Sequence, residues 1–366
     1  MANQSVSKPR FWLDFTQLLR AKGYFADSET SGLTVSPDKI YSLREDDVGN
    51  VWKFDYTNPT VFNGLVNLRW KFIMTDPPDD LPKEWRKLLS TINWLGFINH
   101  NLGSVWNNQG GYSSSQLLGM IKFSISGSTG YSFNHTLTDY VNGDFSYNGY
   151  SIYTVSPDAK PIDASNYWDR IEIGFQNLPS WVDSYFELGA IPFGKYIDID
   201  SSPDLSVKKT VEYDGSKSYR TLGGSDISTS DYQGQPDWVV GEPWTLYYTN
   251  LGFSYSPGRV GRNGRRSWEL TFSYLSNDDV FYDWQELVVG GSAETSDGVE
   301  GDFNSTSEIQ QIWDLTLGGA LSFVFTPDKD ATNPEFAVCR LDQDSLVATQ
   351  VAFQTWNISM RVVEVW

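Results

Sequence analysis

The chain has 366 residues, of which 46 are Asp or Glu and 27 are Lys or Arg, so its formal net charge is −19. This balance argues against a protein that binds nucleic acid or an anionic membrane surface, because both depend on concentrated Lys and Arg. One cysteine rules out an internal disulfide framework, and two histidines are too few for the usual zinc or iron site, so we expect no metal and no cofactor.

Aromatic residues make up 15% of the chain and glycine is frequent, a composition typical of β-rich proteins. In chain order, the first periodic segment is Lys83–Leu95, where apolar residues recur at three- and four-residue steps after Pro82. This spacing predicts a helix. Asn99–Ser115 is rich in Asn, Gly and Ser without periodicity, which indicates a long loop. Short strands are predicted at Ile121–Ile125, Tyr150–Val155 and Arg170–Phe175.

A hairpin is predicted around Asp214-Gly215, because this dipeptide favours the positive φ angles of a tight turn. Leu205–Tyr213 would lead into the turn and Ser216–Leu222 would lead out of it.

The clearest strand signal is Ser267–Leu275, which alternates between apolar and polar residues. Its apolar face would consist of Trp268, Leu270, Phe272 and Tyr274. The C-terminus repeats the pattern with Trp356, Ile358, Met360 and Val362, and Leu321–Phe325 indicates a further strand.

A second helix is predicted at Asp278–Val288, with Asn277 as its N-cap and Gly290-Gly291 as its end. The following segment, Gly290–Ser307, carries four acidic residues and no basic residue, and we expect a long loop there.

Two acidic patterns could carry chemistry. Asp198–Asp204 spaces its oxygen atoms like the start of a calcium-binding loop, but Pro203 and Lys209 occupy the positions that need Gly and Glu. A turn between strands is therefore the better interpretation. The many carboxylates could also supply the acid pair of a glycosidase, whose separation a sequence does not give.

One basic cluster stands out in this acidic chain, at Gly258–Arg266. It lacks the Lys-Ser/Thr ending of a phosphate-binding loop, so pairing with acidic residues of a neighbouring subunit is favoured over phosphate contact. With two terminal tryptophans, the cluster supplies the candidate interface residues Arg259, Arg262, Arg265, Arg266, Trp12 and Trp366. We assign no catalytic, cofactor-binding or metal-binding residue.

The second half of the chain resembles virion structural proteins of tailed bacteriophages, in particular tail-tip or baseplate proteins of the distal tail type. The segments that carry this resemblance are Phe186–Asp198, Ser202–Val207, Tyr213–Gly215, Thr221–Gly224, Arg265–Ser276, Phe336–Asp342 and Trp356–Trp366. Tyr167–Phe175, running toward Glu187–Ile191, is similar to the late strands of a galectin-like or carbohydrate-module-like β-sandwich.

The resemblance implies a mainly β fold with two short helices, in which a ring-forming belt domain, a β-barrel or split barrel, accompanies a β-sandwich. Residues 1–95 and 201–366 would form the belt domain, and residues 96–200 the sandwich. The protein would be a non-enzymatic virion component, assembled in the host cytoplasm into a homo-oligomeric ring, commonly a hexamer. Its partners would be the tail tube, the tail-tip hub proteins and peripheral fibres, with DNA passing through without specific binding.

Two alternatives remain open from the sequence. The chain could be a carbohydrate- or receptor-binding adhesin, with Trp106 as a glycan contact, or a polysaccharide hydrolase. No apolar run approaches the roughly 18 residues of a membrane helix, and we expect neither a secretory signal nor a membrane partner.

Overall fold

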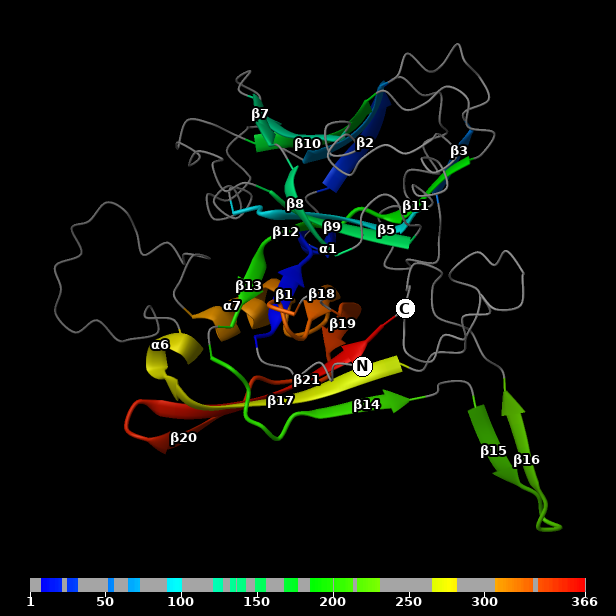
Figure 1. The fold of residues 1–366 in the computed structure, drawn as a ribbon, viewed down its shortest axis with the longest axis vertical. Coiled ribbons are helices and arrows are strands. Elements are labelled where there is room, and N and C mark those ends of the chain that lie inside the picture. The colour runs from blue at the N-terminus through cyan, green and yellow to red at the C-terminus, as the bar shows by residue number, and fades with distance from the viewer. Residues whose placement is uncertain are drawn as a thin grey trace.

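Figure 1 shows the fold, taken from a computed structural model of the chain. The structure describes residues 8–21, 25–31, 52–55, 65–72, 91–100, 121–127, 132–135, 137–142, 149–155, 168–176, 185–199, 201–212, 216–230, 265–281, 307–331 and 335–365.

The largest sheet, called sheet A, has eight antiparallel strands and brings together the two ends of the chain. Its order is β13-β1-β18-β19-β21-β17-β14, and β20 pairs with β21 beside this path. The strands are β1 (Arg10–Leu13), β13 (Tyr196–Asp198), β14 (Lys208–Glu212), β17 (Arg265–Ser276), β18 (Phe323–Thr326), β19 (Ala337–Leu341), β20 (Ala348–Ala352) and β21 (Thr355–Glu364).

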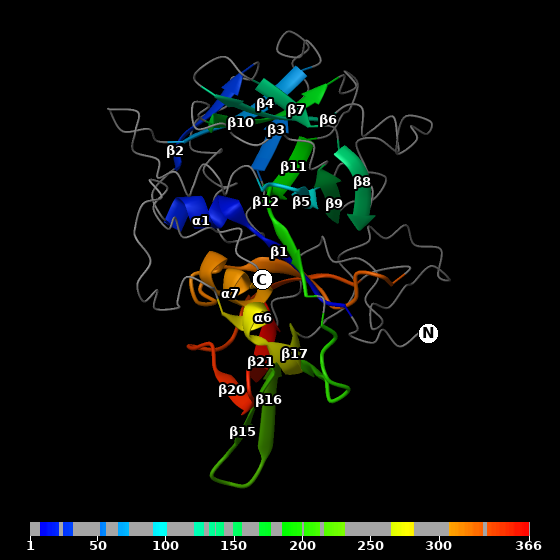
Figure 2. The ribbon, with the colours of Figure 1, turned by 90° about the vertical axis from the view of Figure 1, so that its left-hand side faces the viewer.

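Two further antiparallel sheets come from the middle of the chain, and Figures 1 and 2 show sheets B, C and A following one another along the long axis. Sheet B, in the order β2-β4-β10-β6-β7, consists of β2 (Phe25–Ser31), β4 (Leu65–Phe72), β6 (Ile121–Gly127), β7 (Ser132–His135) and β10 (Trp168–Gln176). Sheet C, in the order β3-β11-β5-β9-β8 with β12 beside β5, consists of β3 (Trp52–Asp55), β5 (Trp94–His100), β8 (Leu137–Asn142), β9 (Gly149–Val155), β11 (Tyr185–Ala190) and β12 (Phe193–Gly194).

A separate two-stranded hairpin is formed by β15 (Ser216–Arg220) and β16 (Asp226–Ser230). In Figures 1 and 2 it projects beyond sheet A, away from the rest of the described chain.

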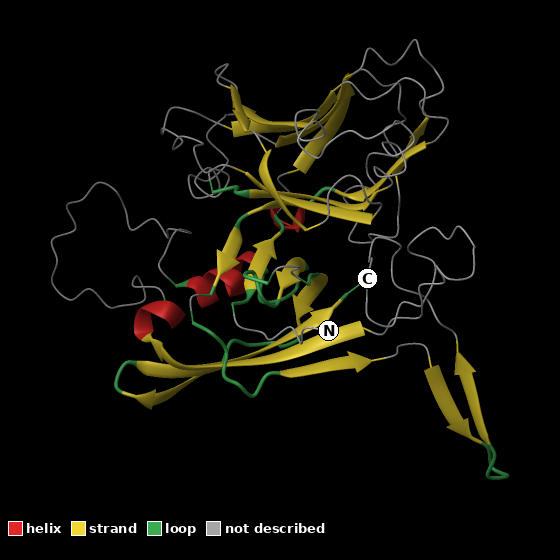
Figure 3. Ribbon diagram, viewed as in Figure 1, coloured by secondary structure: helices red, strands yellow, loops and turns green. Residues whose placement is uncertain are grey.

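The described helices are short, as Figure 3 shows. They are α1 (Phe15–Ala21), α6 (Asn277–Val280) and α7 (Glu308–Leu315). Ser307 caps α7, because its hydroxyl accepts a hydrogen bond from the Gln310 amide at 3.3 Å. The helix then buries Ile309, Ile312 and Leu315 and packs against β1 and β13.

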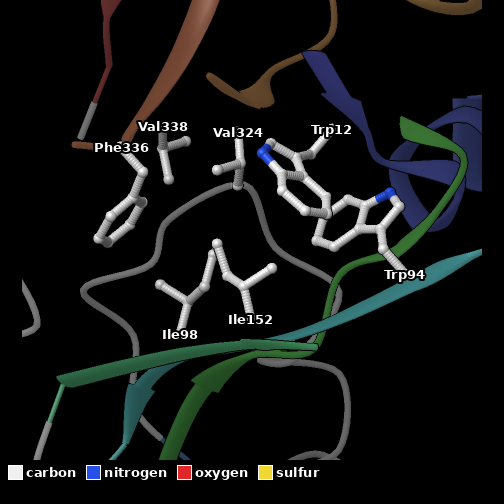
Figure 4. Close-up of a cluster of buried hydrophobic side chains, with 7 residues drawn as sticks. All are labelled: Trp12, Trp94, Ile98, Ile152, Val324, Phe336 and Val338. Carbon is white, nitrogen blue, oxygen red and sulfur yellow. The ribbon is translucent and has the colours of Figure 1, made fainter. Parts of the chain in front are cut away.

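The core that joins sheet A to sheet C is built around two tryptophans (Figure 4). Trp12 from β1 and Trp94 from β5 meet edge to face, with ring centroids 5.6 Å apart. Both indole N–H groups are satisfied: Trp12 donates to Thr326 Oγ1 at 2.9 Å and Trp94 donates to the Leu13 carbonyl at 3.1 Å. The surrounding side chains are Ile98, Ile152, Val324, Phe336 and Val338.

The structure confirms a mainly β chain with short helices, and sheet A is an open sheet rather than a closed barrel. All predicted strands outside the hairpin around residue 214 are present, at β6, β9, β10, β17, β18 and β21.

One face of β17 was predicted correctly except at Tyr274. Trp268, Leu270 and Phe272 are fully buried, whereas Tyr274 is 81% exposed. The pairing of β17 with β21 shifts between Phe272 and Leu275, and Tyr274 has a φ of 62°. This β-bulge inserts one residue, so that Leu275 takes the buried position instead.

The predicted hairpin at Asp214-Gly215 is wrong. The strand before it, β14, pairs with β17, and the strand after it, β15, pairs with β16. The turn lies at Thr221–Ser225, where Gly224 has a φ of +84° and its amide donates to the Thr221 carbonyl at 2.9 Å. Glycine adopts this left-handed conformation without steric strain.

Both predicted helices need correction. Residues 91–93 are turn and coil and Trp94 begins β5, so Lys83–Leu95 does not end as a helix; its first eight residues lie outside the described chain. The second predicted helix, Asp278–Val288, begins as α6, which makes a single turn because Phe281 is already extended at φ −120° and ψ 151°. Its N-cap is Ser276 rather than Asn277, with Asp279 completing a capping box.

Described elements also overlap the ends of the expected loops and one expected domain boundary. Asn99 and His100 belong to β5, and Ser307 caps α7, while the remaining residues of both expected loops lie outside the described chain. The boundary expected after residue 95 falls inside β5. Strands from residues 25–72 pair with strands from residues 94–190, whereas residues 10–13 pair with residues 196–198 and 323–326.

We expect Trp268→Ala to lower the free energy of unfolding by about 3–5 kcal/mol, because a large buried side chain would leave a cavity. Tyr274→Ala, on the same strand but exposed, should change it by no more than about 0.5 kcal/mol. Denaturant unfolding measures both. Equal losses in the two variants would contradict the orientation of β17.

Candidate assembly surface

Arg266 was predicted to pair with a neighbouring subunit, but its side chain is fully buried in its own chain. It lies at the start of β17, opposite the end of β21, and its guanidinium reaches Glu364, which is also fully buried. Arg266 Nη2 lies 2.8 Å from Glu364 Oε1 and Nε lies 3.0 Å from Oε2, which makes a bidentate pair. This burial leaves Arg266 no surface to offer to another copy, so its expected role is corrected to one inside sheet A.

The buried pair continues outward through two further charges. Arg266 Nη1 donates to Glu335 Oε1 at 2.6 Å, and Lys209 Nζ on β14 donates to the same oxygen at 2.7 Å. Burial alone would raise the pKa of Glu335, but the positive charges of Arg266 and Lys209 outweigh it and hold that pKa below its ordinary value. Arg266, Glu364, Glu335 and Lys209 thus form an alternating charge chain that ties together β14, β17 and β21.

Trp12 is likewise buried in the core between sheets A and C, so its expected place at a subunit interface is wrong. Its neighbour Arg10 forms a two-pronged pair with Asp198 of β13, with Nη2 2.8 Å from Oδ2. The Arg10 guanidinium also lies 4.1 Å from the Tyr196 ring centroid. Asp198, the first residue of the calcium-like pattern, is therefore used to hold β13 against β1.

The remaining candidate residues are placed as follows. Arg265 is half-buried at the beginning of β17. Arg259, Arg262, Trp366 and the glycan candidate Trp106 lie outside the described residues, and their roles stay predictions.

Sequence analysis missed the hairpin of residues 216–230, which we call the arm. Directly opposite residues of an antiparallel pair share a face, and Tyr219 stands opposite Ile227. Both side chains are more than half exposed, and Leu222 in the turn is fully exposed. A two-stranded hairpin is at best marginally stable by itself in water, so an arm with an uncovered apolar face is a candidate contact surface.

A second apolar surface lies at the end of sheet A where β20 turns into β21. We call it the end patch, and it consists of Tyr274, Val347, Val351 and Phe353, all exposed. Tyr274 belongs to this end because its amide donates to Asn357 Oδ1 on β21 at 3.0 Å. The signal that could have revealed the patch is the run from Ser345 to Met360, which contains no charged residue.

Within the described ranges, no three side chains of His, Cys, Asp or Glu come close enough together to hold a metal ion. Cys339 is buried in β19, and this burial, together with the charge of Glu364, raises the pKa of its thiol well above the ordinary value. None of the described helices is long and apolar enough to span a bilayer.

Comparison of the chain with protein-family models, with curated proteins and with solved structures finds no match.

We expect Arg266→Met to lower the free energy of unfolding by about 3–5 kcal/mol, because Glu364 would keep a buried charge without a partner. The double change Arg266→Met with Glu364→Leu should recover most of this loss, since no uncompensated charge then remains. Lys208→Ala is the control, because it breaks only the exposed 3.1 Å pair with Glu269 and should cost less than about 1 kcal/mol. A double variant as unstable as the single variant would contradict the pairing.

We also expect Glu335→Gln to flatten the loss of stability on acidification. Because the folded-state pKa of Glu335 lies below its ordinary value of 4.5, its stabilisation is complete above that value and disappears as the pH falls through the folded-state pKa. Unfolding midpoints measured at a series of pH values from neutral to acidic give the slope. Glu269→Gln, which changes an exposed carboxylate outside the charge chain, is the matched control.

Proposed function

We propose that the protein is a structural subunit that assembles with copies of itself into a ring, and that this ring belongs to the tail tip of a bacteriophage. The observation that carries the proposal is the arm, whose apolar side chains Tyr219, Leu222 and Ile227 are left uncovered by the described chain. Exposed apolar groups on a projecting element are typical of surfaces that become buried on association.

The architecture supports a structural role. Sheet A joins residues from both ends of the chain, and its buried charges are neutralised within the sheet. The lowered pKa of Glu335 is explained by its pairing with Arg266 and Lys209, and the raised pKa of Cys339 by its burial. Glu335 links β17 to β14 through these two partners, and we propose a structural role without catalysis.

The charge of the chain supports the location at a tail tip. A ring of subunits with a net charge of −19 each offers little to which the phosphates of a passing DNA can adsorb. The ring would lie between the tail tube and the hub or fibre proteins, as the resemblance of residues 165–366 to distal tail proteins implies. A hexamer is the stoichiometry that this resemblance favours.

Purified protein at micromolar concentration and moderate salt should form a single closed oligomer, which light scattering coupled to gel filtration and negative-stain images measure. We expect the double variant Tyr219→Ser with Ile227→Ser to be monomeric, because the apolar face of the arm is removed while the strand residues stay exposed. Ser218→Ala, on the opposite face of β15, is the control and should assemble normally. A wild-type protein that stays monomeric throughout this range would refute the proposal.

A further inference from the structure

The arm and the end patch lie at opposite ends of sheet A. Figure 1 shows β15 and β16 beyond one end of the sheet and the β20–β21 turn at the other. The arm of a molecule therefore does not cover the end patch of the same molecule. A second copy of the chain, in contrast, supplies both surfaces.

The two surfaces are similar in apolar character. The arm exposes Tyr219, Leu222 and Ile227, and the end patch exposes two valines and two aromatic rings from β17, from β20 and from the residues that flank β20. The patch includes Phe353, which is 86% exposed and directly follows β20. Contacts of this composition, with aromatic side chains at the centre, are typical of the core of a protein interface.

The charges around the two surfaces are complementary. The arm contains the basic residues Lys217 and Arg220 and one acidic residue, Asp226, which lies 4.0 Å from Arg220, so its sequence carries one net positive charge. Two carboxylates lie beside the end patch: Asp204 accepts a hydrogen bond at 2.6 Å from Ser273, the residue before Tyr274, and Asp279 accepts one at 2.8 Å from Ser276, which stands opposite Thr355 next to the β20–β21 turn. An arm with a positive balance would thus meet a rim with a negative balance, which favours this orientation of the two copies over contacts between like surfaces.

We propose that the arm of one copy lies on the end patch of the next copy, in a head-to-tail contact. This inference rests on the self-assembly proposed above and names the two surfaces that make it. Because the two partners use different surfaces, each copy keeps one arm and one patch available for further neighbours, and the series ends only when a ring closes.

The contact can be tested by mixing two defective variants of the full chain. The arm variant carries Tyr219→Ser and Ile227→Ser, and the patch variant carries Val351→Ser and Phe353→Ser. Each variant alone should associate about 100-fold more weakly than the wild type, because apolar side chains central to the contact are lost. An equimolar mixture should give a two-copy species and nothing larger, since it offers one intact arm and one intact patch. Gln350→Ala, an exposed change on β20 whose side chain lies on the other face of the strand from Val347, is the control and should assemble as the wild type does.

The outcomes separate the two proposals. A patch variant that still forms the wild-type oligomer overturns the head-to-tail contact and leaves self-assembly standing, whereas a monomeric wild type refutes both. An arm variant that is monomeric beside a patch variant that assembles would indicate contacts between two arms, which also overturns the inference. Thermal unfolding midpoints near that of the wild type show that the variants are folded.

A second measurement does not depend on weakened association. Copies carrying Leu222→Cys are mixed with copies carrying Phe353→Cys and oxidised. Because the native Cys339 is buried, the expected product is a disulfide between the two different copies. Disulfides only between identical copies would overturn the contact.

Discussion

A guanidinium group without access to water must be matched by carboxylates at fixed positions, and sheet A is organised around one such group. Arg266 receives this match from Glu364 on β21 and from Glu335, which Lys209 on β14 also holds. The pair fixes β17 against β21, and its extension holds β14 at the edge of the sheet. In the chain, β14 precedes the arm and β21 follows the end patch. The same charges therefore stabilise the strands that lie next to both surfaces.

Alternating strands were predictable because one face of each is buried and the other is exposed. The same alternation could also have revealed the buried pair: counting back by two from Trp268 leads to Arg266, and counting forward by two from Val362 leads to Glu364. Arg266, at the end of a buried face, was interpreted as an interface residue, because charge usually marks exposure. Its partner Glu364 lies 98 residues later in the chain, a separation that local pattern does not show.

The predicted C-terminal end of the helix at Lys83–Leu95 was wrong for a different physical reason. Residues 94–98 of β5 are buried throughout, so this strand has no polar face and no period of two. Its apolar run then fits helical spacing as well as strand spacing. The hairpin predicted at Asp214-Gly215 was wrong because a turn-forming dipeptide only permits the chain to reverse. Which turn forms a hairpin depends on which strands pair. Of the arm, the sequence predicted only the strand at Ser216–Leu222. The exposure of Tyr219 and Ile227 could not be predicted, because it depends on the hairpin projecting from the fold.

The position of β1 in sheet A sets the order in which the sheet can form during synthesis. Residues 10–13 are synthesised long before their hydrogen-bond partners, which are residues 196–198 and 323–326. At roughly 5–20 residues per second, the second partner is synthesised about 15–60 s after the first strand. During that interval Phe11, Trp12 and Leu13 lack the strands that bury them. We therefore expect β1 to join sheet A late, and a nascent chain of this protein to be a natural client for chaperones that shield apolar segments until β18 has been synthesised.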